Sequence, residues 1–128
     1  MKKILLDTNF LMIPSQYKVD IYAEIDRLLP AYQLTTLDVV IDELKKLALK
    51  GKGRYDAKLA LALLKHKKVI ILHSKNKTLK NADEIILNTA NKDNYIVCTQ
   101  DRGLKRLLRQ KKVPLIVLRQ KNHLDLLI

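Results

Sequence analysis

The stretch Ile4-Leu5-Leu6-Asp7-Thr8-Asn9 decides the fold, because an apolar run of strand length stops abruptly at an acid. Consecutive apolar residues are typical of a strand that is buried on both faces, as in a parallel sheet. Asp7 therefore ends a central strand, where a carboxylate has no surface to which it can turn. In open α/β sheets, ligands bind beyond the carboxyl ends of the strands. The stretch thus predicts a parallel sheet with Asp7 at its functional edge.

Apolar runs alternate with stretches of helical periodicity through the rest of the chain. Because strands spaced by helices are typical of βαβ units, we expect one α/β domain over residues 1–128. The expected fold is a three-layer sandwich around a parallel sheet of five strands. The strands are predicted at residues 3–7, 33–36, 69–72, 95–99 and 113–118, and the helices at 9–13, 20–29, 37–49, 54–65, 81–91 and 101–110.

Three details of this pattern concern the ends of elements. Pro14 is expected to end the first short helix, because the residue before a proline is biased away from helical geometry. The polar and basic stretch 74–80 is predicted to be a loop. The tail, residues 122–128, ends in apolar side chains, so we expect it to dock on the body of the domain or on a second subunit.

Three further carboxylates belong with Asp7. Asp101 follows the strand predicted at 95–99, so it lies at the same carboxyl edge of the sheet. Glu43 and Asp83 lie on predicted helices. At about 100° per residue, each falls at the border of the apolar stripe of its helix, while its acidic neighbour points toward water. A border position lets a side chain lean over the end of the sheet.

Each of these acids also has a purely structural explanation. Asp101 is a favoured residue for a helix N-cap. Asn81-x-x-Glu84 resembles a capping box, and an acid in that first turn suits the positive end of the helix dipole. Glu43 has Lys46 at helical spacing as an ion-pair partner. Asp7 is the hardest to explain in this way, because it ends a buried strand.

Four carboxylates that meet in one cleft repel each other unless a cation neutralises them. Oxygen ligands without histidine or cysteine favour Mg²⁺ or Mn²⁺ over zinc. Such an ion lowers the pKa of a bound water molecule and stabilises the charge that develops on a phosphate. The acids therefore predict a divalent-metal site that cuts a nucleic acid.

The strong positive charge of the chain points to the same substrate. Lys and Arg number 25 against 13 Asp and Glu, which gives a formal net charge of +12. Surface ion networks of heat-adapted proteins are the alternative explanation, but 13 acids leave many bases without a partner. Nucleic acid is the commonest partner of such a surface, and an anionic membrane is a weaker candidate.

Two groups of basic residues are the candidate contacts to RNA. Lys50-Gly51-Lys52-Gly53-Arg54 is a flexible basic loop that can clamp a phosphate backbone, and a solvated turn explains it equally well. Arg102 and Lys105 begin a basic helix, whose bases can also be the polar flank of core leucines. The predicted nucleic-acid contacts are Lys50, Lys52, Arg54, Arg102 and Lys105.

Cysteine usage and hydropathy indicate the compartment. Cys98 is the only cysteine, so an intramolecular disulfide and a multi-cysteine zinc site are excluded, and a reducing interior fits best. No apolar run has the length needed to span a bilayer, and the N-terminal run meets Asp7 too early for a signal peptide. We therefore expect a soluble, cytoplasmic protein with no membrane partner.

Four short motifs in chain order resemble those of the PIN-domain nucleases: Leu6-Asp7-Thr8-Asn9, Asp42-Glu43-Leu44, Ala82-Asp83 and Thr99-Gln100-Asp101. The resemblance covers residues 3–118. It implies a sheet of strand order 3-2-1-4-5 and hydrolysis of RNA by a water molecule that Mg²⁺ or Mn²⁺ activates. It also implies a metal-binding and catalytic set with two supporting polar groups. The set is Asp7, Glu43, Asp83 and Asp101, and the supporting groups are Asn9 and Thr99.

Within that family, residues 99–106 and 113–119 look most like the single-domain archaeal branch allied to ribosomal-RNA-processing nucleases. This similarity implies an endoribonuclease of ribosomal RNA processing with a ribosome-assembly partner. Toxin ribonucleases of toxin–antitoxin pairs share the four acids, so a toxin with an antitoxin partner is an alternative. The apolar tail and the family both suggest a homodimer.

Two further classes are weaker candidates. A non-catalytic RNA-binding protein of the same fold has no use for an intact acid set, which weakens RNA binding. A phosphatase-like or nucleotide-binding domain is disfavoured because the chain has no Gly-rich phosphate loop.

Overall fold

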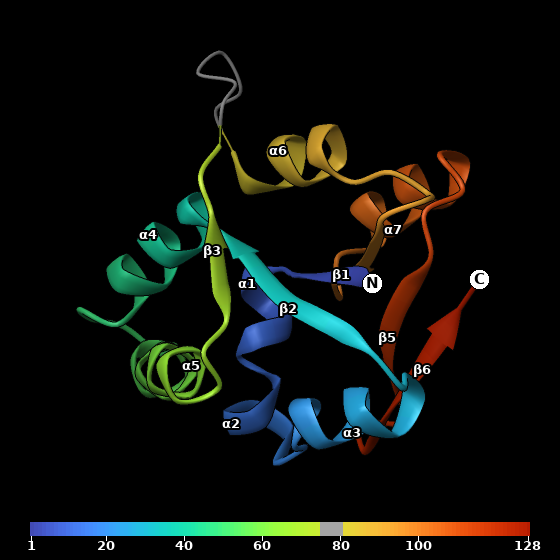
Figure 1. The fold of residues 1–128 in the computed structure, drawn as a ribbon. Helices are drawn as coiled ribbons and strands as arrows, with labels where there is room; N and C mark the ends of the chain where they lie inside the picture. The colour runs from blue at the N-terminus through green and yellow to red at the C-terminus, as the bar shows by residue number, and fades with distance from the viewer. Residues whose placement is uncertain (75–80) are drawn as a thin grey trace.

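The fold, taken from a computed structural model that describes residues 1–74 and 81–128, is built on one six-stranded sheet (Figure 1). The strand order is β3-β2-β1-β4-β5-β6. The first five strands pair in parallel, which confirms the predicted order 3-2-1-4-5. Their bounds are β1 Lys2–Leu6, β2 Tyr32–Leu37, β3 Ile70–Leu72, β4 Tyr95–Cys98 and β5 Leu115–Arg119.

The sixth strand is the apolar tail, which docks on the body of the protein. Strand β6, His123–Leu127, pairs antiparallel with β5 through a turn in which Gln120 and Lys121 have φ of 53° and 60°. The outer edge of β6 is covered by α3: Arg27 donates to the carbonyl of Leu124 (2.7 Å), and the Leu124 N–H donates to Glu24 (2.9 Å). These bonds satisfy backbone groups that an edge strand otherwise leaves open.

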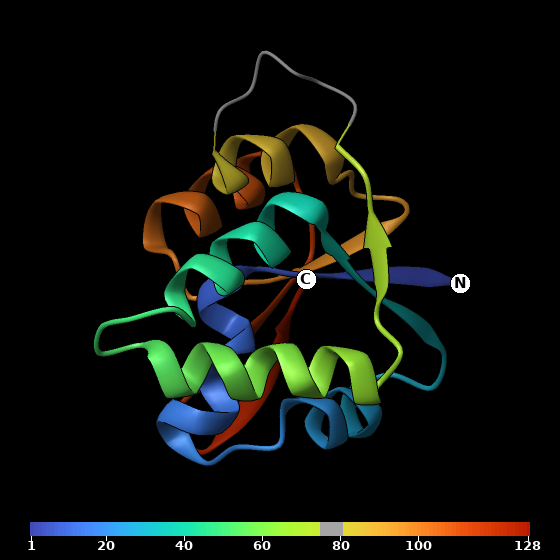
Figure 2. The ribbon, with the colours of Figure 1, turned by 90° about the vertical axis from the view of Figure 1, so that its left-hand side faces the viewer.

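Seven helices in the described residues complete three layers. Helices α6 and α7 lie on one side of the sheet, and α1, α2, α3 and α5 lie on the other (Figures 1 and 2). The side view also shows α4 beside α5, with which it is in contact (Figure 2). Their bounds are α1 Thr8–Leu11, α2 Ile13–Tyr17, α3 Ile21–Leu28, α4 Asp38–Leu47, α5 Arg54–His66, α6 Ala82–Thr89 and α7 Arg102–Gln110.

The prediction for Pro14 is wrong in one respect. Helix α1 already ends at Leu11, and Pro14 lies in the first turn of α2. A proline is tolerated there because the first N–H groups of a helix have no intrahelical acceptor. Pro14 therefore starts a second short helix and does not end the first one.

The core is centred on β1, as its unbroken apolar run predicts. Ile4, Leu5 and Leu6 are fully buried, because helices cover both faces of the central strand. Two buried threonines of β2 fix it to β1: the hydroxyls of Thr35 and Thr36 each donate 2.7 Å hydrogen bonds to carbonyl oxygens of β1. This rigid centre holds the carboxyl end of β1 in place.

Two further predictions concern the loop at 74–80 and the lack of a membrane-spanning segment. Apart from Ser74, the loop predicted at 74–80 lies outside them. Within residues 1–74 and 81–128, no helix combines the length and the hydrophobicity that crossing a lipid bilayer requires.

Candidate functional site: an acidic cleft at the carboxyl edge of the sheet

A small cleft of about 220 Å³ opens where β1 and β4 end, and all four predicted acids line it. Asp7 directly follows strand β1. Asp101 lies in the loop after β4, directly before α7. Glu43 comes from the middle of α4, and Asp83 from the first turn of α6. The cleft is lined by Asp7, Thr8, Asn9, Glu43, Asn81, Ala82, Asp83 and Asp101.

Asp7 is held rigidly at the bottom of this cleft. The residue is only 3% exposed. One carboxylate oxygen accepts the N–H of Thr8 at 2.8 Å, which caps α1, and the other accepts the hydroxyl of Thr99 at 2.6 Å. The Asp7 backbone N–H donates to the carbonyl of Cys98 (3.0 Å), so β4 continues to hold the chain there. Asp7 is therefore fixed in direction by both neighbouring segments.

Burial raises the pKa of Asp7 from its usual value of 3.8 to about 6. The hydrogen bonds from Thr99 and Thr8 oppose this rise, and the negative charges of Asp83 and Glu43 add to it. A buried carboxylate whose pKa is raised by other carboxylates is typical of a site that is built to bind positive charge. The pKa of Asp83 is also raised, mainly because its carboxylate is partly desolvated at the cleft and in addition by the charge of Asp101.

Asp101 caps a helix and also lines the cleft. Its side chain accepts the N–H of Leu104 at 2.8 Å and so forms the N-cap of α7. It also lines the cleft. Thr99 connects it to Asp7, because the Asp101 N–H donates to the same hydroxyl that bonds Asp7 (3.1 Å). The geometry thus ties the two strand-end acids together through one buried threonine.

Asn9 forms hydrogen bonds with the loop between β4 and α7, which carries Asp101. Its side-chain oxygen accepts the N–H of Gln100 (3.2 Å), and its carbonyl accepts the side-chain amide of Gln100 (3.4 Å). These bonds tie the beginning of α1 to the loop after β4. Of the two residues predicted as supporting groups, Asn9 contacts the loop that carries Asp101, and Thr99 is part of that loop.

Glu43 and Asp83 approach the cleft from exposed helix positions. Both side chains are exposed, as expected for residues at the border of an apolar stripe. In the described part of the chain, Glu43 forms no ion pair with Lys46, so the structural explanation for it fails. Asn81 does cap α6, since its side-chain oxygen accepts the N–H of Glu84 at 2.9 Å and its side-chain amide donates to the Glu84 carboxylate at 3.3 Å.

Thr8 and Asn81 also line the cleft and were not predicted as site residues. Thr8 is 4% exposed, and its hydroxyl has no hydrogen-bond partner among the described residues. A buried hydroxyl without a partner is unusual and calls for an explanation. The only signal in the sequence is its position directly after Asp7, at the mouth of the strand.

The side chains that line the cleft carry the type of donor atom that a hard divalent cation prefers. The donors are four carboxylates and the unpaired hydroxyl of Thr8, all of them oxygen, which suits Mg²⁺ or Mn²⁺. Within the described residues, however, no three acid, histidine or cysteine side chains are close enough as they stand to share one ion. Two of the four acids, Glu43 and Asp83, are exposed and can change rotamer to move closer to Asp7.

The predicted basic contacts lie in two places outside the cleft. Lys50 and Lys52 are exposed on the loop between α4 and α5, and Arg54 begins α5, with its guanidinium 4.8 Å from the ring centre of Tyr55. Arg102 and Lys105 lie on α7 and line a separate hollow of about 640 Å³. Among the described residues that line the acidic cleft, none is basic.

The fold and this cleft define the class of the protein. Residues 4–121 match the family described as a PIN like domain, and the chain belongs to this family.

Two curated relatives carry the name ribonuclease. The chain is 36% identical to Ribonuclease VapC4 of Methanocaldococcus jannaschii over 132 residues, which cover 98% of this chain and 97% of that protein. It is 32% identical to Ribonuclease VapC9 of Archaeoglobus fulgidus over 117 residues, or 90% of this chain and 82% of that one. Among solved structures, the PIN domain endonuclease Utp24 has a similar fold, with a TM-score of 0.81, 24% identity, and coverage of 97% of this chain and 90% of that one.

Proposed function

We propose that this protein is a divalent-metal-dependent endoribonuclease that hydrolyses RNA phosphodiester bonds at the acidic cleft. The observation that carries the proposal is the convergence of Asp7, Glu43, Asp83 and Asp101 at the carboxyl edge of the sheet. Membership of the PIN-like family and two relatives named ribonuclease support it.

In this proposal the four acids hold the cation, and the polar groups around them fix their positions. Thr99 orients Asp7, and Asn9 steadies the loop before Asp101. The rigid pair, Asp7 and Asp101, defines the site, while exposed Glu43 and Asp83 close around it. When bound there, Mg²⁺ or Mn²⁺ supplies charge that lowers the pKa of water and offsets charge developing on the phosphate.

A cleavage assay tests the proposal directly. Labelled single-stranded and structured RNA are incubated with the protein in Mn²⁺ or Mg²⁺, and in EDTA. We expect cleavage with either metal and none in EDTA. Because an ion that binds only the folded state stabilises it, saturating Mn²⁺ should also raise the unfolding free energy, by about 2.7 kcal/mol at 100 times its Kd. RNA binding without metal-dependent cleavage would instead favour a non-catalytic RNA-binding protein.

Replacing Thr8 with valine tests the unpaired hydroxyl. Because valine keeps the shape and removes a buried polar atom, we expect the variant in EDTA to be as stable as the parent or more stable by about 1 kcal/mol. Its stabilisation by Mn²⁺ should be smaller than that of the parent, measured by thermal unfolding over a range of Mn²⁺ concentrations.

The matched control for Thr8→Val is Thr36→Val. The hydroxyl of Thr36 already donates to the carbonyl of Leu6, so its loss should destabilise the protein by about 1 kcal/mol and leave the Mn²⁺ response unchanged. An unaltered Mn²⁺ response in Thr8→Val would show that the hydroxyl has no part in cation binding.

The biological substrate and partner follow only from the family resemblance. Similarity to ribosomal-RNA-processing nucleases favours a ribosomal RNA precursor and a ribosome-assembly partner. The toxin alternative predicts instead that a separate antitoxin protein binds the chain and blocks cleavage. Co-purification from the native host distinguishes the two, since ribosomal precursor particles or one small inhibitory protein would be recovered. Homodimerisation and a cytoplasmic location are proposed on the same grounds.

A further inference from the structure

The two edges of the sheet differ in how they are protected. At one edge, Arg27 and Glu24 of α3 form hydrogen bonds with the backbone of Leu124 in β6. Within residues 1–74 and 81–128, the other edge is β3, whose single neighbouring strand is β2. Figures 1 and 2 show β3 at the margin of the sheet, between α5 and α6. No described segment therefore pairs with the outer side of the β3 backbone.

The side chains of β3 add an apolar surface to this edge. Ile70 is 46% exposed and Ile71 is 45% exposed. Edge strands are usually protected against pairing with another chain by a charged residue, a proline or a very short length. Residues 69–72 contain neither a charged residue nor a proline, so the short length of β3 is the protection that they do have. An edge of this kind is suited to accept a further strand.

A hollow of about 760 Å³ lies between β3 and α6, and Leu37, Leu72 and Ile85 give it apolar walls. Leu37 and Leu72 are register partners, so they lie on the same face of the sheet. Because successive strand residues alternate between the two faces, Ile70 shares the face of the hollow, and Ile71 lies on the opposite face, toward α5. A strand that pairs with β3 would therefore place alternate side chains at the mouth of this hollow.

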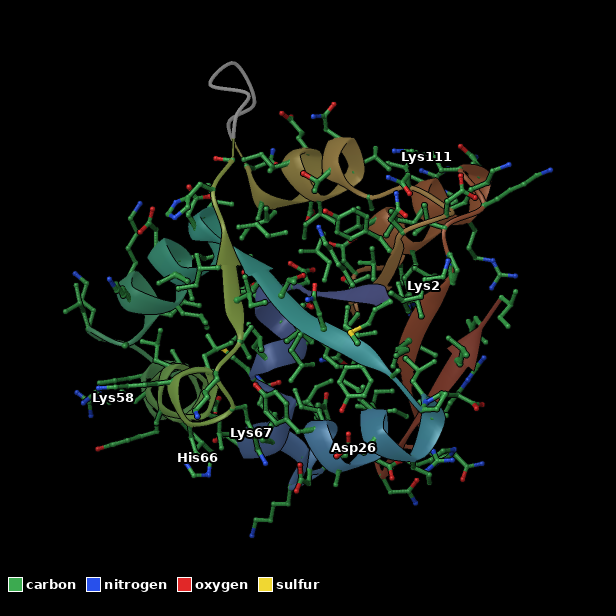
Figure 3. All side chains as sticks on the ribbon, viewed as in Figure 1. Lys2, Asp26, Lys58, His66, Lys67 and Lys111 are labelled. Carbon is green, nitrogen blue, oxygen red and sulfur yellow. The ribbon has the colours of Figure 1, made fainter. Side chains whose placement is uncertain are left out.

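The chain that leads into β3 is basic. Lys65, Lys67 and Lys68 are exposed, and residues 65–74 contain no acid. Figure 3 shows Lys67 at the end of α5, from which the chain turns into β3. Within residues 1–74 and 81–128, none of the three lysines forms an ion pair. The edge thus combines open backbone groups, exposed isoleucines and positive charge that no described acid pairs with.

These features favour a peptide strand over other occupants. The backbone groups of a sheet edge pair with another extended backbone, which RNA does not supply. A second copy of this chain carries the same lysines and the same net charge of +12, so two β3 edges repel each other. A segment that carries acidic residues beside its apolar ones is attracted by the lysines and also satisfies the edge.

We propose that β3 is a docking edge for an extended, acidic segment of a partner protein, which adds a seventh strand to the sheet. Apolar side chains at alternate positions of this segment cover Ile70 and point into the hollow beside α6. The acidic residues of the segment lie beside Lys65, Lys67 and Lys68. This inference goes beyond the proposed function, because the edge lies outside the acidic cleft and needs neither a metal nor RNA.

Peptide binding in EDTA, without RNA, tests the proposal. The first probe is a short labelled peptide in which valine alternates with threonine and a run of glutamates follows. In the second probe the glutamates come first, because the added strand can run in either direction. One of the two probes should bind, and a shuffled peptide of the same composition should bind at least about 10-fold more weakly, because it loses the alternation that a strand edge requires. Fluorescence anisotropy gives the affinities.

Ile71→Lys tests the apolar edge, because it places a charge where the added strand pairs. Burial of the exposed half of one isoleucine side chain accounts for about 3- to 10-fold in affinity, so the loss should be about 10-fold or more. The matched control is Leu59→Lys, since Leu59 on α5 is 41% exposed and lies outside the β3 edge. This control should bind the peptide like the parent.

Lys65→Gln/Lys68→Gln tests the charge and leaves Lys67, which packs on the ring of Tyr22. Peptide binding should weaken by about 3- to 10-fold at about 0.1 M salt and by less at about 0.5 M. Its control is Lys105→Gln/Arg106→Gln, which removes the same charge from α7, next to β5. This control should bind the peptide like the parent.

Hydrogen exchange of the parent protein gives a readout that depends on no substitution. A seventh strand should slow the exchange of backbone amides in the fragment that contains Ile70–Leu72 by at least about 10-fold at saturating peptide. Exchange in the fragment that contains β6 should not change. Binding by charge alone would leave the amides of β3 as they are without peptide.

Several results would overturn the proposal: no binding of either probe, unchanged exchange in β3 with peptide bound, or equal losses in a variant and its matched control. A dimer of the parent that Ile71→Lys abolishes would show that a second copy covers the edge. RNA binding that Ile71→Lys abolishes and Leu59→Lys does not would assign the edge to RNA, and either result would also overturn the proposal. Because no arm measures cleavage, failure here and failure of the proposed function are distinguishable.

Discussion

Replacing Asp7 with asparagine should abolish RNA cleavage and at the same time make the protein more stable in EDTA. Loss of groups that only orient metal ligands costs about 10- to 100-fold, so loss of a ligand itself should reduce cleavage by at least about 100-fold. The fall in activity and the rise in stability have one cause, because Asp7 is a carboxylate that the fold buries beside other carboxylates.

The gain in stability follows from the pKa of Asp7, which is raised from 3.8 to about 6. Above this range the folded state must carry a buried charge that the unfolded chain carries in water, so stability falls as the pH rises between these two values. The difference corresponds to about 3 kcal/mol for the fully ionised group, reduced by any weakening of the bond to Thr99. The asparagine side chain of the variant does not ionise, so the variant should not show this fall in stability as the pH rises.

Urea unfolding in EDTA at a series of pH values measures the effect. The unfolding free energy of Asp7→Asn minus that of the parent should be small below pH 4 and should increase through pH 5 and 6. Above about pH 7 this difference should level off at about 1–3 kcal/mol in favour of the variant. Asp42→Asn is the control, because Asp42 is an exposed neighbour of Glu43 on α4. It should change neither cleavage nor the pH dependence of stability.

Two outcomes would count against this account of Asp7. A variant that is less stable than the parent at pH 8 would mean that the bonds from Thr8 and Thr99 outweigh the cost of burial. A variant that still cleaves RNA in Mn²⁺ would remove Asp7 from the catalytic set, whatever its effect on stability.

Much of the fold was predictable because β1 is unambiguous. Its short apolar run, which stops at an acid, is typical of a doubly buried strand, and the helices between later strands make parallel pairing the expected result. The tail was harder, since apolar residues 124–127 indicated burial without indicating direction. A tight hairpin turn with two positive φ values usually contains Asn-Gly, whereas here Gln120 and Lys121 adopt them. The antiparallel β6 was therefore hidden by atypical turn residues.

The acids of the candidate site could be predicted from the sequence, whereas other features of the site could not. Asp7 and Asp101 follow directly from the ends of strands, and helical periodicity brings Glu43 and Asp83 to the border of the core. Periodicity gives the face on which a side chain lies but says nothing about whether a small hydroxyl finds a partner. The unpaired hydroxyl of Thr8 depends on tertiary contacts, and so does the hollow between α7 and β5.

Two substitutions of Asp101 separate the carboxylate that lines the cleft from the oxygen that caps α7. Serine should remove only the first, and alanine should remove both. Both substitutions remove the carboxylate, so both should reduce cleavage by at least about 100-fold, as for Asp7. Only alanine removes the oxygen that accepts the N–H of Leu104 and caps α7. Loss of an N-cap costs about 1 kcal/mol, so Asp101→Ala should unfold at lower urea concentration than Asp101→Ser.

Comparison of these two variants decides between the structural and the catalytic explanation of Asp101. If Asp101 only caps α7, the serine variant keeps full activity and the alanine variant loses activity only as far as it unfolds. If Asp101 belongs to the cation site, both variants are equally inactive at a temperature where both are folded, and both lose stabilisation by Mn²⁺. The second outcome is expected, because Asp101 lines the same cleft as Asp7 and shares the hydroxyl of Thr99 with it. A helix cap alone does not need to face three other carboxylates.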